Sequence, residues 1–128
     1  MPAMRTRMAD KLNVEACIRG LEQATGADGP QGRRKALDRL VVLLFTTDTA
    51  APALVSLGGV RLLLDATRDR DEKVRLHAVH ALARLASVGY TKAVRDAGGV
   101  PALKALLDDP YLPIREMAAK ALEKLQEI

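Results

Sequence analysis

The chain has 128 residues, with 20 Lys and Arg against 16 Asp and Glu, and therefore a formal net charge of +4. Hydrophobic residues make up 48% of it but aromatic residues only 2%, so the core is expected to be aliphatic, which suits closely packed helices better than a sheet. The single cysteine, Cys17, excludes an internal disulfide, and no apolar run approaches the roughly 20 residues of a membrane span. We therefore expect an intracellular, cytoplasmic protein, with the nucleus as the alternative compartment.

Two amphipathic stretches occupy the first 46 residues. Asn13 is predicted to cap a helix that begins at Val14, and residues 1–12 to form a tail or a degenerate helix. The apolar residues of the first stretch, at helical spacing, are Val14, Cys17, Ile18 and Leu21. A loop is predicted over residues 27–32, because this segment contains Asp-Gly-Pro. The second stretch has a predicted buried side of Leu37, Leu40, Val41 and Leu44. Phe45 is a further candidate for this side.

The rest of the chain contains two copies of a three-helix unit. In the first copy, Thr49 is predicted to cap a short helix that stops at Gly58-Gly59, and Asp71 to cap a long helix that reaches Ser87. A middle helix is expected between them, over residues 60–67. The corresponding helices of the second copy are predicted over 90–97, 100–107 and 113–127.

The two copies repeat with a period of 40 residues, since Gly58-Gly59-Val60 matches Gly98-Gly99-Val100. The apolar pairs that continue this register are Leu63 with Leu103, Val74 with Ile114, Ala78 with Ala118 and Leu82 with Leu122. The two N-terminal stretches fit the same pattern with steps of 46 and 41 residues. A helical period near 40 predicts an all-α fold, a right-handed α-solenoid of about three repeats. We expect a single domain over residues 13–128, with repeats at about 13–46, 49–87 and 90–128.

Two segments of the repeated unit carry a family resemblance. Residues 96–103 read Asp-Ala-Gly-Gly-Val-Pro-Ala-Leu, and residues 74–86 follow a Val-x-x-x-Ala-x-x-Ala-Leu pattern. These segments resemble the turn and the third helix of the armadillo repeat, and the last unit also resembles the related HEAT repeat. The resemblance implies a non-enzymatic scaffold or adaptor that binds other proteins, since solenoids of this kind serve as interaction modules.

The resemblance also implies a site. In armadillo proteins that hold extended peptides, a Trp and an Asn of each third helix line a concave groove. This chain has basic residues at most of these positions, and His77 shares their face because it lies three residues before His80. The groove is therefore expected to hold an acidic or extended peptide segment. Its candidate residues are Arg39, His77, His80, Arg84, Lys120 and Lys124.

Other interpretations of the basic face stay open. Charges are usual on any solvated helix face, and a basic groove could instead bind the phosphate backbone of a nucleic acid. The face shows no aromatic platform on which bases could stack, so we expect a protein or peptide partner first and nucleic acid as the alternative. No membrane partner is expected. The leucine-rich last repeat is a candidate surface for self-association.

No catalytic, metal or cofactor site is expected. His77 and His80 are spaced like a metal pair but lack the third and fourth ligands that zinc requires. The acidic segment 69–72 lacks the central Gly and the closing Glu of a calcium loop, and its residues are interpreted as turn and cap residues. Cys17 lies on an apolar stripe and is interpreted as a small core residue.

Overall fold

The computed structural model describes residues 2–23 and 29–126. Within these ranges the chain forms helices and turns and has no β-strand. The helices are α1 (Pro2–Gln23), α2 (Gly29–Thr46), α3 (Ala50–Ser56), α4 (Gly59–Ala66), α5 (Glu72–Ser87), α6 (Thr91–Asp96), α7 (Gly99–Ala105), the short 3₁₀ helix η1 (Leu106–Asp108) and α8 (Leu112–Gln126).

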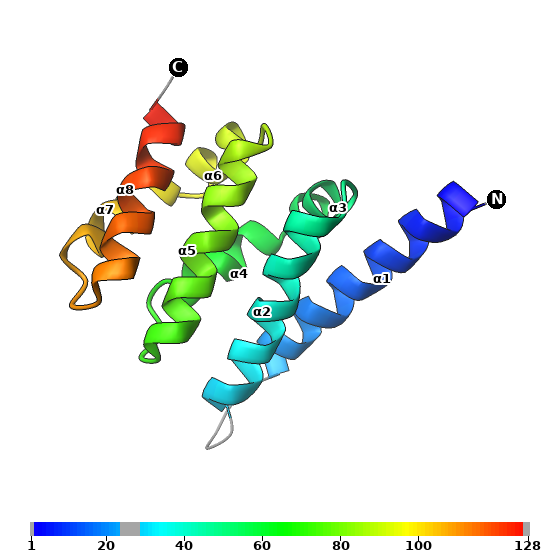
Figure 1. Ribbon diagram of the computed structural model, residues 1–128, viewed down its shortest axis with the longest axis horizontal. Helices are drawn as coiled ribbons and strands as arrows, with labels where there is room; N and C mark the ends of the chain where they lie inside the picture. The colour runs from blue at the N-terminus through cyan, green and yellow to red at the C-terminus, as the bar shows by residue number, and fades with distance from the viewer. Residues whose placement is uncertain (1, 24–28, 127–128) are drawn as a thin grey trace.

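The helices are stacked in layers. Figure 1 shows α2, α5 and α8 side by side in one row, and α2 contacts α5, which contacts α8. Behind this row, α4 packs on α5 and α7 packs on α8. We call α2, α5 and α8 the long-helix layer, and its surface away from α4 and α7 the long-helix face. This arrangement confirms the all-α solenoid that the repeat period predicts.

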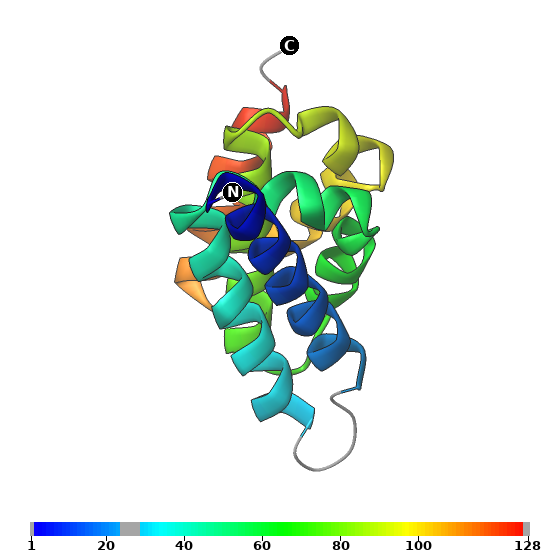
Figure 2. The same cartoon turned by 90° about the vertical axis from the view of Figure 1, so that its right-hand side faces the viewer.

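The N-terminal segment differs from the sequence prediction. Helix α1 runs without a break through Asn13, so Asn13 is not a helix cap. The reason is local: Pro2 occupies the first helical position, where its missing N–H costs nothing, and the residues after it are mostly good helix formers. Helix α1 contacts α2, α3 and α4 and lies across one end of the stack (Figure 2).

The predicted loop over residues 27–32 is also wrong over residues 29–32. Helix α2 begins at Gly29, and residues 27 and 28 lie outside the described ranges. Pro30 falls in the first turn of α2, where it removes no intrahelical hydrogen bond. The division into repeats at 13–46, 49–87 and 90–128 stays a prediction.

The core is aliphatic, as the composition indicates. One contiguous cluster extends from α1 to α8, and its fully buried members include Val14, Leu37, Leu63, Val74, Ala78, Leu82, Leu103, Ile114, Ala118 and Leu125. Cys17 is buried among them, which confirms its interpretation as a core residue. The prediction that placed Phe45 on the buried side is wrong, because 47% of this residue is exposed.

The repeated Gly-Gly pair has two different functions. Gly98 has a φ of 96°, a left-handed conformation that a residue with a Cβ adopts at a cost. Gly99 has room for no side chain, because a Cβ would lie 2.7 Å from the carbonyl oxygen of Val94 in the preceding helix. The first glycine therefore makes the turn, and the second allows α7 to pack closely on α6.

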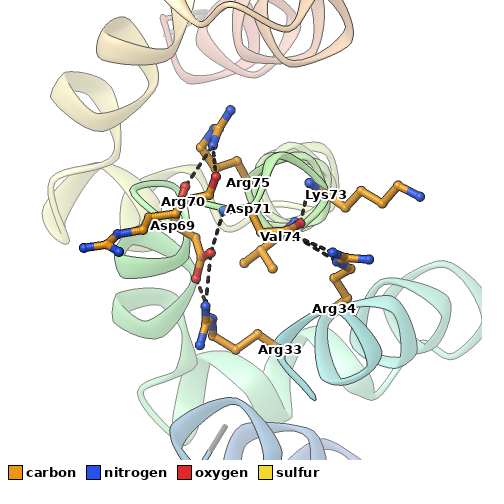
Figure 3. A network of polar contacts seen from close by, with 8 residues as sticks. All are labelled: Arg33, Arg34, Asp69, Arg70, Asp71, Lys73, Val74 and Arg75. Carbon is orange, nitrogen blue, oxygen red and sulfur yellow. Dashed lines mark hydrogen bonds and ion pairs between the residues drawn. The ribbon is translucent and has the colours of Figure 1, made fainter. Parts of the chain in front are cut away.

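Two aspartates hold α2 to the turn before α5 (Figure 3). Asp69 accepts a hydrogen bond from the Asp71 N–H at 2.9 Å and forms an ion pair with Arg33 of α2. Asp71 caps α5 by accepting from the N–H groups of Lys73 and Val74, and it forms an ion pair with Arg34. These contacts confirm the prediction for Asp69, as a turn residue, and for Asp71, as a cap.

The next junction repeats the same chemistry. Arg75 of α5 donates from Nε to the Asp109 carboxylate at 2.9 Å and from another nitrogen to the Asp69 carbonyl, also at 2.9 Å. Asp109, which is 40 residues after Asp69, accepts from the Tyr111 N–H at 3.0 Å. Arg115, the equivalent of Arg75, donates to the Asp109 carbonyl at 2.7 Å. The junctions thus align the N-terminal parts of the three long helices.

The ion pair at the cap of α5 predicts a pH-dependent stability. The hydrogen bond from Arg34 lowers the pKa of Asp71; burial opposes this, and the N–H groups of Val74 and Lys73 reinforce it. A carboxyl whose pKa is lower in the folded state stabilises the fold above its unfolded value of about 3.9 and loses this contribution as the pH falls. Asp71→Asn keeps a capping oxygen but removes the charge, so we expect it to lower the free energy of unfolding at pH 7 by about 1 kcal/mol.

This difference should shrink below about pH 4, where the unfolded chain begins to bind a proton at this carboxyl, and should be lost as the pH falls through the lower pKa of the folded state. Urea titrations of both proteins at pH 7 and pH 3 measure it. Asp65→Asn, at an exposed position of α4, is the control and should change stability by less than about 0.5 kcal/mol at either pH. An equal Asp71→Asn effect at both pH values would contradict the contribution of the charge.

Candidate functional site

The six residues predicted to line the groove all lie on the long-helix layer. At about 100° per residue, position 80 is about 200° around α5 from Ala78, which is fully buried, so His80 faces away from the core. Arg39, Lys120 and Lys124 are exposed, and His77, His80 and Arg84 are half-buried. Their helices are α2 for Arg39, α5 for His77, His80 and Arg84, and α8 for Lys120 and Lys124.

An aromatic residue joins the basic ones near the C-terminal ends of α2 and α5. The guanidinium carbon of Arg84 lies 4.7 Å from the ring centroid of Phe45. The ring of His80 lies 5.0 Å from that of Phe45, with an angle of 51° between the planes. Arg84 and His80 come from α5 and Phe45 from α2, so this cluster bridges two repeats. A cation over an aromatic ring is an attractive contact.

Phe45 was not among the predicted site residues, and its ring lies on the face that was predicted to have no aromatic platform for bases. Phe45 follows the buried Leu44 and therefore looked like an extension of the apolar stripe. The repeat register contains a usable signal, because Phe45 is 41 residues before Ala86. Ala86 is buried in α5, and a much larger ring at the equivalent position of α2 extends out beside the next helix.

Two of the predicted groove residues also contact the preceding long helix. Arg84 donates from Nε to the carbonyl oxygen of Leu44 at 3.1 Å, near the end of α2. Lys124 of α8 contacts the hydroxyl of Ser87, the last residue of α5. A positive charge near a helix C-terminus is favourable, so both residues stabilise the junctions. A guanidinium has five N–H donors, and the Leu44 bond uses one of those of Arg84.

His80 gives the face a charge that depends on pH. Burial lowers the pKa of His80 from its usual value, and the neighbouring His77 lowers it further. The imidazole is therefore neutral down to a lower pH than a free histidine. Acidification adds a positive charge beside Phe45 and Arg84.

Arg39 lies at the edge of a cleft between α1 and α2. The cleft has a volume of about 300 Å³, and α2 contributes Asp38, Arg39, Val42 and Leu43 to its lining. Helix α1 contributes Asn13, Ala16 and Cys17. Burial raises the pKa of the Cys17 thiol, and the charge of Arg39 partly opposes this. The thiol is therefore protonated at neutral pH.

A second groove lies between α4 and α7, away from the long-helix face. Its volume is larger, about 600 Å³, and its charged lining residues are Arg61, Asp65, Arg68 and Asp96. The two signs alternate there, so this groove does not select a ligand by net charge.

The described residues contain no group of three or more His, Cys, Asp or Glu side chains that could hold a metal ion. In the same part of the chain, no helix is both long and apolar enough to cross a membrane.

Stacked helical units with this layer order define an α-solenoid of the armadillo/HEAT kind, a class that generally serves as a non-enzymatic binding scaffold. The family model for HEAT repeats matches residues 60–127, more than half of the chain. The chain belongs to the HEAT-repeat family, and its repeats are armadillo/HEAT-like. No curated protein matches it.

Several solved structures are similar. A crystal structure of an engineered protein from the Northeast Structural Genomics Consortium is 32% identical, with a TM-score of 0.77 over 88% of this chain and 44% of the other. A designed armadillo repeat protein is 23% identical, with a TM-score of 0.73 over 85% of this chain and 45% of its own. A second designed armadillo protein, in complex with the peptide (KR)4, is 21% identical, with a TM-score of 0.74 over 88% of this chain and 46% of its own. The chain thus spans less than half the length of these proteins, and the two designed armadillo structures support the fold alone.

The contact between Arg84 and Phe45 predicts a measurable coupling between two repeats. Arg84→Met and Phe45→Leu each remove the cation–ring contact, so the double mutant should lose less stability than the sum of the two. We expect a coupling energy of about 0.5–1 kcal/mol, measured by denaturant unfolding. A control cycle of Arg84→Met with Leu112→Ala, at an exposed position of α8, should give no coupling. Equal values from the two cycles would contradict a specific contact.

Proposed function

We propose that this protein is a non-enzymatic scaffold or adaptor that binds an acidic or phosphorylated segment of another protein along its long-helix face. The observation that supports this most strongly is the repetition of basic side chains at equivalent positions, with a permanent charge on the Arg and Lys residues and a pH-dependent charge on His80. Residues 39, 80 and 120 occupy one position on the three long helices, and residues 84 and 124 occupy a second on α5 and α8. The proposed binding residues are Arg39, His77, His80, Arg84, Lys120 and Lys124.

The spacing of the long helices suits an extended segment. Packed helices lie about 8–10 Å apart, and an extended chain rises about 3.3 Å per residue. Equivalent side chains on neighbouring repeats therefore address residues about three positions apart on the partner. A segment with a carboxylate or phosphate at every third position would meet one basic position per repeat.

The charge preference follows from the side chains. One designed armadillo protein of similar fold is in complex with (KR)4, a peptide of Lys and Arg only, and this supports a peptide as a ligand of such a fold. The corresponding face of this chain is itself basic, which favours a partner of the opposite charge. Phe45 adds an apolar surface beside Arg84, against which the stem of a bound side chain could pack.

Nucleic acid is the alternative ligand, because the same charges would attract phosphates. Sequence-tolerant binding of single strands uses several aromatic side chains, on which successive bases stack. The face offers the Phe45 ring, and Arg84 and His80 already contact it. These contacts favour the peptide over the nucleic acid.

Self-association through the C-terminal repeat is a second interaction that we propose. Leu107 and Leu112 are exposed there, and 53% of Leu112 is accessible. Exposed leucines of this kind could pack against a second copy. This surface is separate from the long-helix positions that would hold a peptide.

Reversal of Lys120 and Lys124 to Glu tests the peptide proposal. Both residues are exposed, and so is the contact of Lys124 with Ser87, so the double variant should fold. Arg84 is less suitable because its bond to the Leu44 carbonyl is partly buried. We expect the affinity for a fluorescent (DE)4 octapeptide, measured by anisotropy, to fall at least about tenfold, or about 1.4 kcal/mol, through like-charge repulsion. Circular dichroism should show unchanged helicity.

The matched control replaces Lys92 and Lys104, which are exposed on α6 and α7, by Glu. This double charge reversal should weaken binding of (DE)4 much less. An equal loss from both pairs would mean that net charge alone decides, and would contradict a site on the long-helix face. Tighter binding of a labelled duplex DNA oligonucleotide than of (DE)4 would favour the nucleic-acid alternative. In that case a plot of log K against the logarithm of the salt concentration should have a slope of about −0.9 for each phosphate contact.

A further inference from the structure

The cleft between α1 and α2 is lined mainly by apolar side chains and is open to solvent. Ala16, Cys17, Val42 and Leu43 make up its apolar lining. Val42 is 52% exposed, and Leu12, which precedes Ala16 by one helical turn on α1, is 58% exposed. An exposed apolar side chain, Val42, thus lines a hollow of about 300 Å³, the lower end of the size range of ligand pockets.

The cleft exists because α1 has small residues where the next repeat has large ones. With the step of 46 residues that relates α1 to α4, Ala16 and Cys17 correspond to Leu62 and Leu63. Leu63 is fully buried and belongs to α4, which packs on α5. The smaller side chains of α1 leave room for an apolar side chain from elsewhere.

The polar rim connects this cleft to the proposed groove. Arg39 lines the cleft and also occupies the position equivalent to His80 and Lys120. Asn13, at the same rim, carries an amide that can both donate to and accept from a peptide backbone. The apolar hollow therefore lies at the α1 end of the line of basic residues, continuous with it through Arg39.

We propose that this cleft is an anchor site for one bulky apolar side chain, such as Leu, Met or Phe, of an acidic peptide segment that continues along the long-helix face. The inference rests on the proposed function, because the basic residues hold the rest of the segment. The cleft lining carries one charge of each sign, Asp38 and Arg39, so the apolar residues of the cleft select the anchor and Arg39 is the group that can pair with a carboxylate beside it. A volume of about 300 Å³ is too small for a helix. The partner is therefore an extended acidic segment with an apolar residue at one end.

The repeat spacing fixes the position of the anchor. Equivalent points on neighbouring long helices lie about three residues apart along an extended chain, so the part of the segment at Arg39 is about three positions from the acidic residue at His80 and Arg84. The anchor enters the cleft beside Arg39 and therefore lies at or next to that position. The acidic residue at Lys120 and Lys124 lies about three positions further on. The expected pattern is apolar-x-x-acidic-x-x-acidic, in either chain direction.

Selection of random nonapeptides displayed on phage against the wild-type protein tests both the pattern and the site. We expect the selected peptides to share two acidic positions that are three residues apart, and one large apolar position that is three residues from the nearer acidic one. A synthetic peptide of the selected sequence should lose at least about tenfold in affinity when its apolar residue is changed to Ala. Ala16→Trp, which fills the cleft, should abolish this difference, whereas Ala119→Trp, at an exposed position of α8, should preserve it.

Cys17 provides an independent readout, since it lines the cleft and is the only cysteine of the chain. Saturation with the selected peptide should slow alkylation of Cys17 by iodoacetamide, measured by intact mass, and the Ala-substituted peptide should protect it less. Acidic peptides without a shared apolar position, or equal protection by both peptides, would overturn the anchor site but leave the proposed function standing. Selected peptides without acidic residues would overturn both.

Discussion

The alignment of the long helices depends on the aspartates and arginines at the repeat junctions. The Asp109 side chain is only 5% exposed, and it accepts hydrogen bonds from both the Arg75 guanidinium and the Tyr111 N–H. A buried carboxylate requires such partners, because its desolvation is costly. Apolar packing is non-directional, so the aliphatic core alone would tolerate small shifts of one helix along the next. The ion pairs fix one register.

The surface chemistry follows from this register. With the N-terminal parts of α2, α5 and α8 held by aspartates, equivalent residues of successive repeats stand at corresponding heights on one face. At the other end, Arg84 bonds to the last turn of α2 and Lys124 to the last residue of α5. The same two side chains therefore stabilise the junctions and present positive charge. A partner that binds them would contact groups already held in place by the fold.

Most of the fold could be predicted from the sequence, because glycine turns, caps and apolar positions agree at a period of 40 residues. The start of α1 could not, since Asn13 is an acceptable cap but also an acceptable residue inside a helix. The positions of the groove candidates on three neighbouring helices followed from the register. The contact of Arg84 with Phe45 could not be predicted from the register, because it depends on the orientation of a large side chain that is only partly buried. The cleft beside Cys17 also depends on the packing of α1.

The central claim is that an acidic segment binds on the long-helix face. Amide chemical shifts of the isotope-labelled protein, followed by NMR during titration with (DE)4, test it most directly. The account predicts that the largest changes cluster on α2, α5 and α8, around His80, Arg84 and Lys120, and that (KR)4 causes none. Changes centred on the groove between α4 and α7, around Arg61 and Arg68, would contradict it.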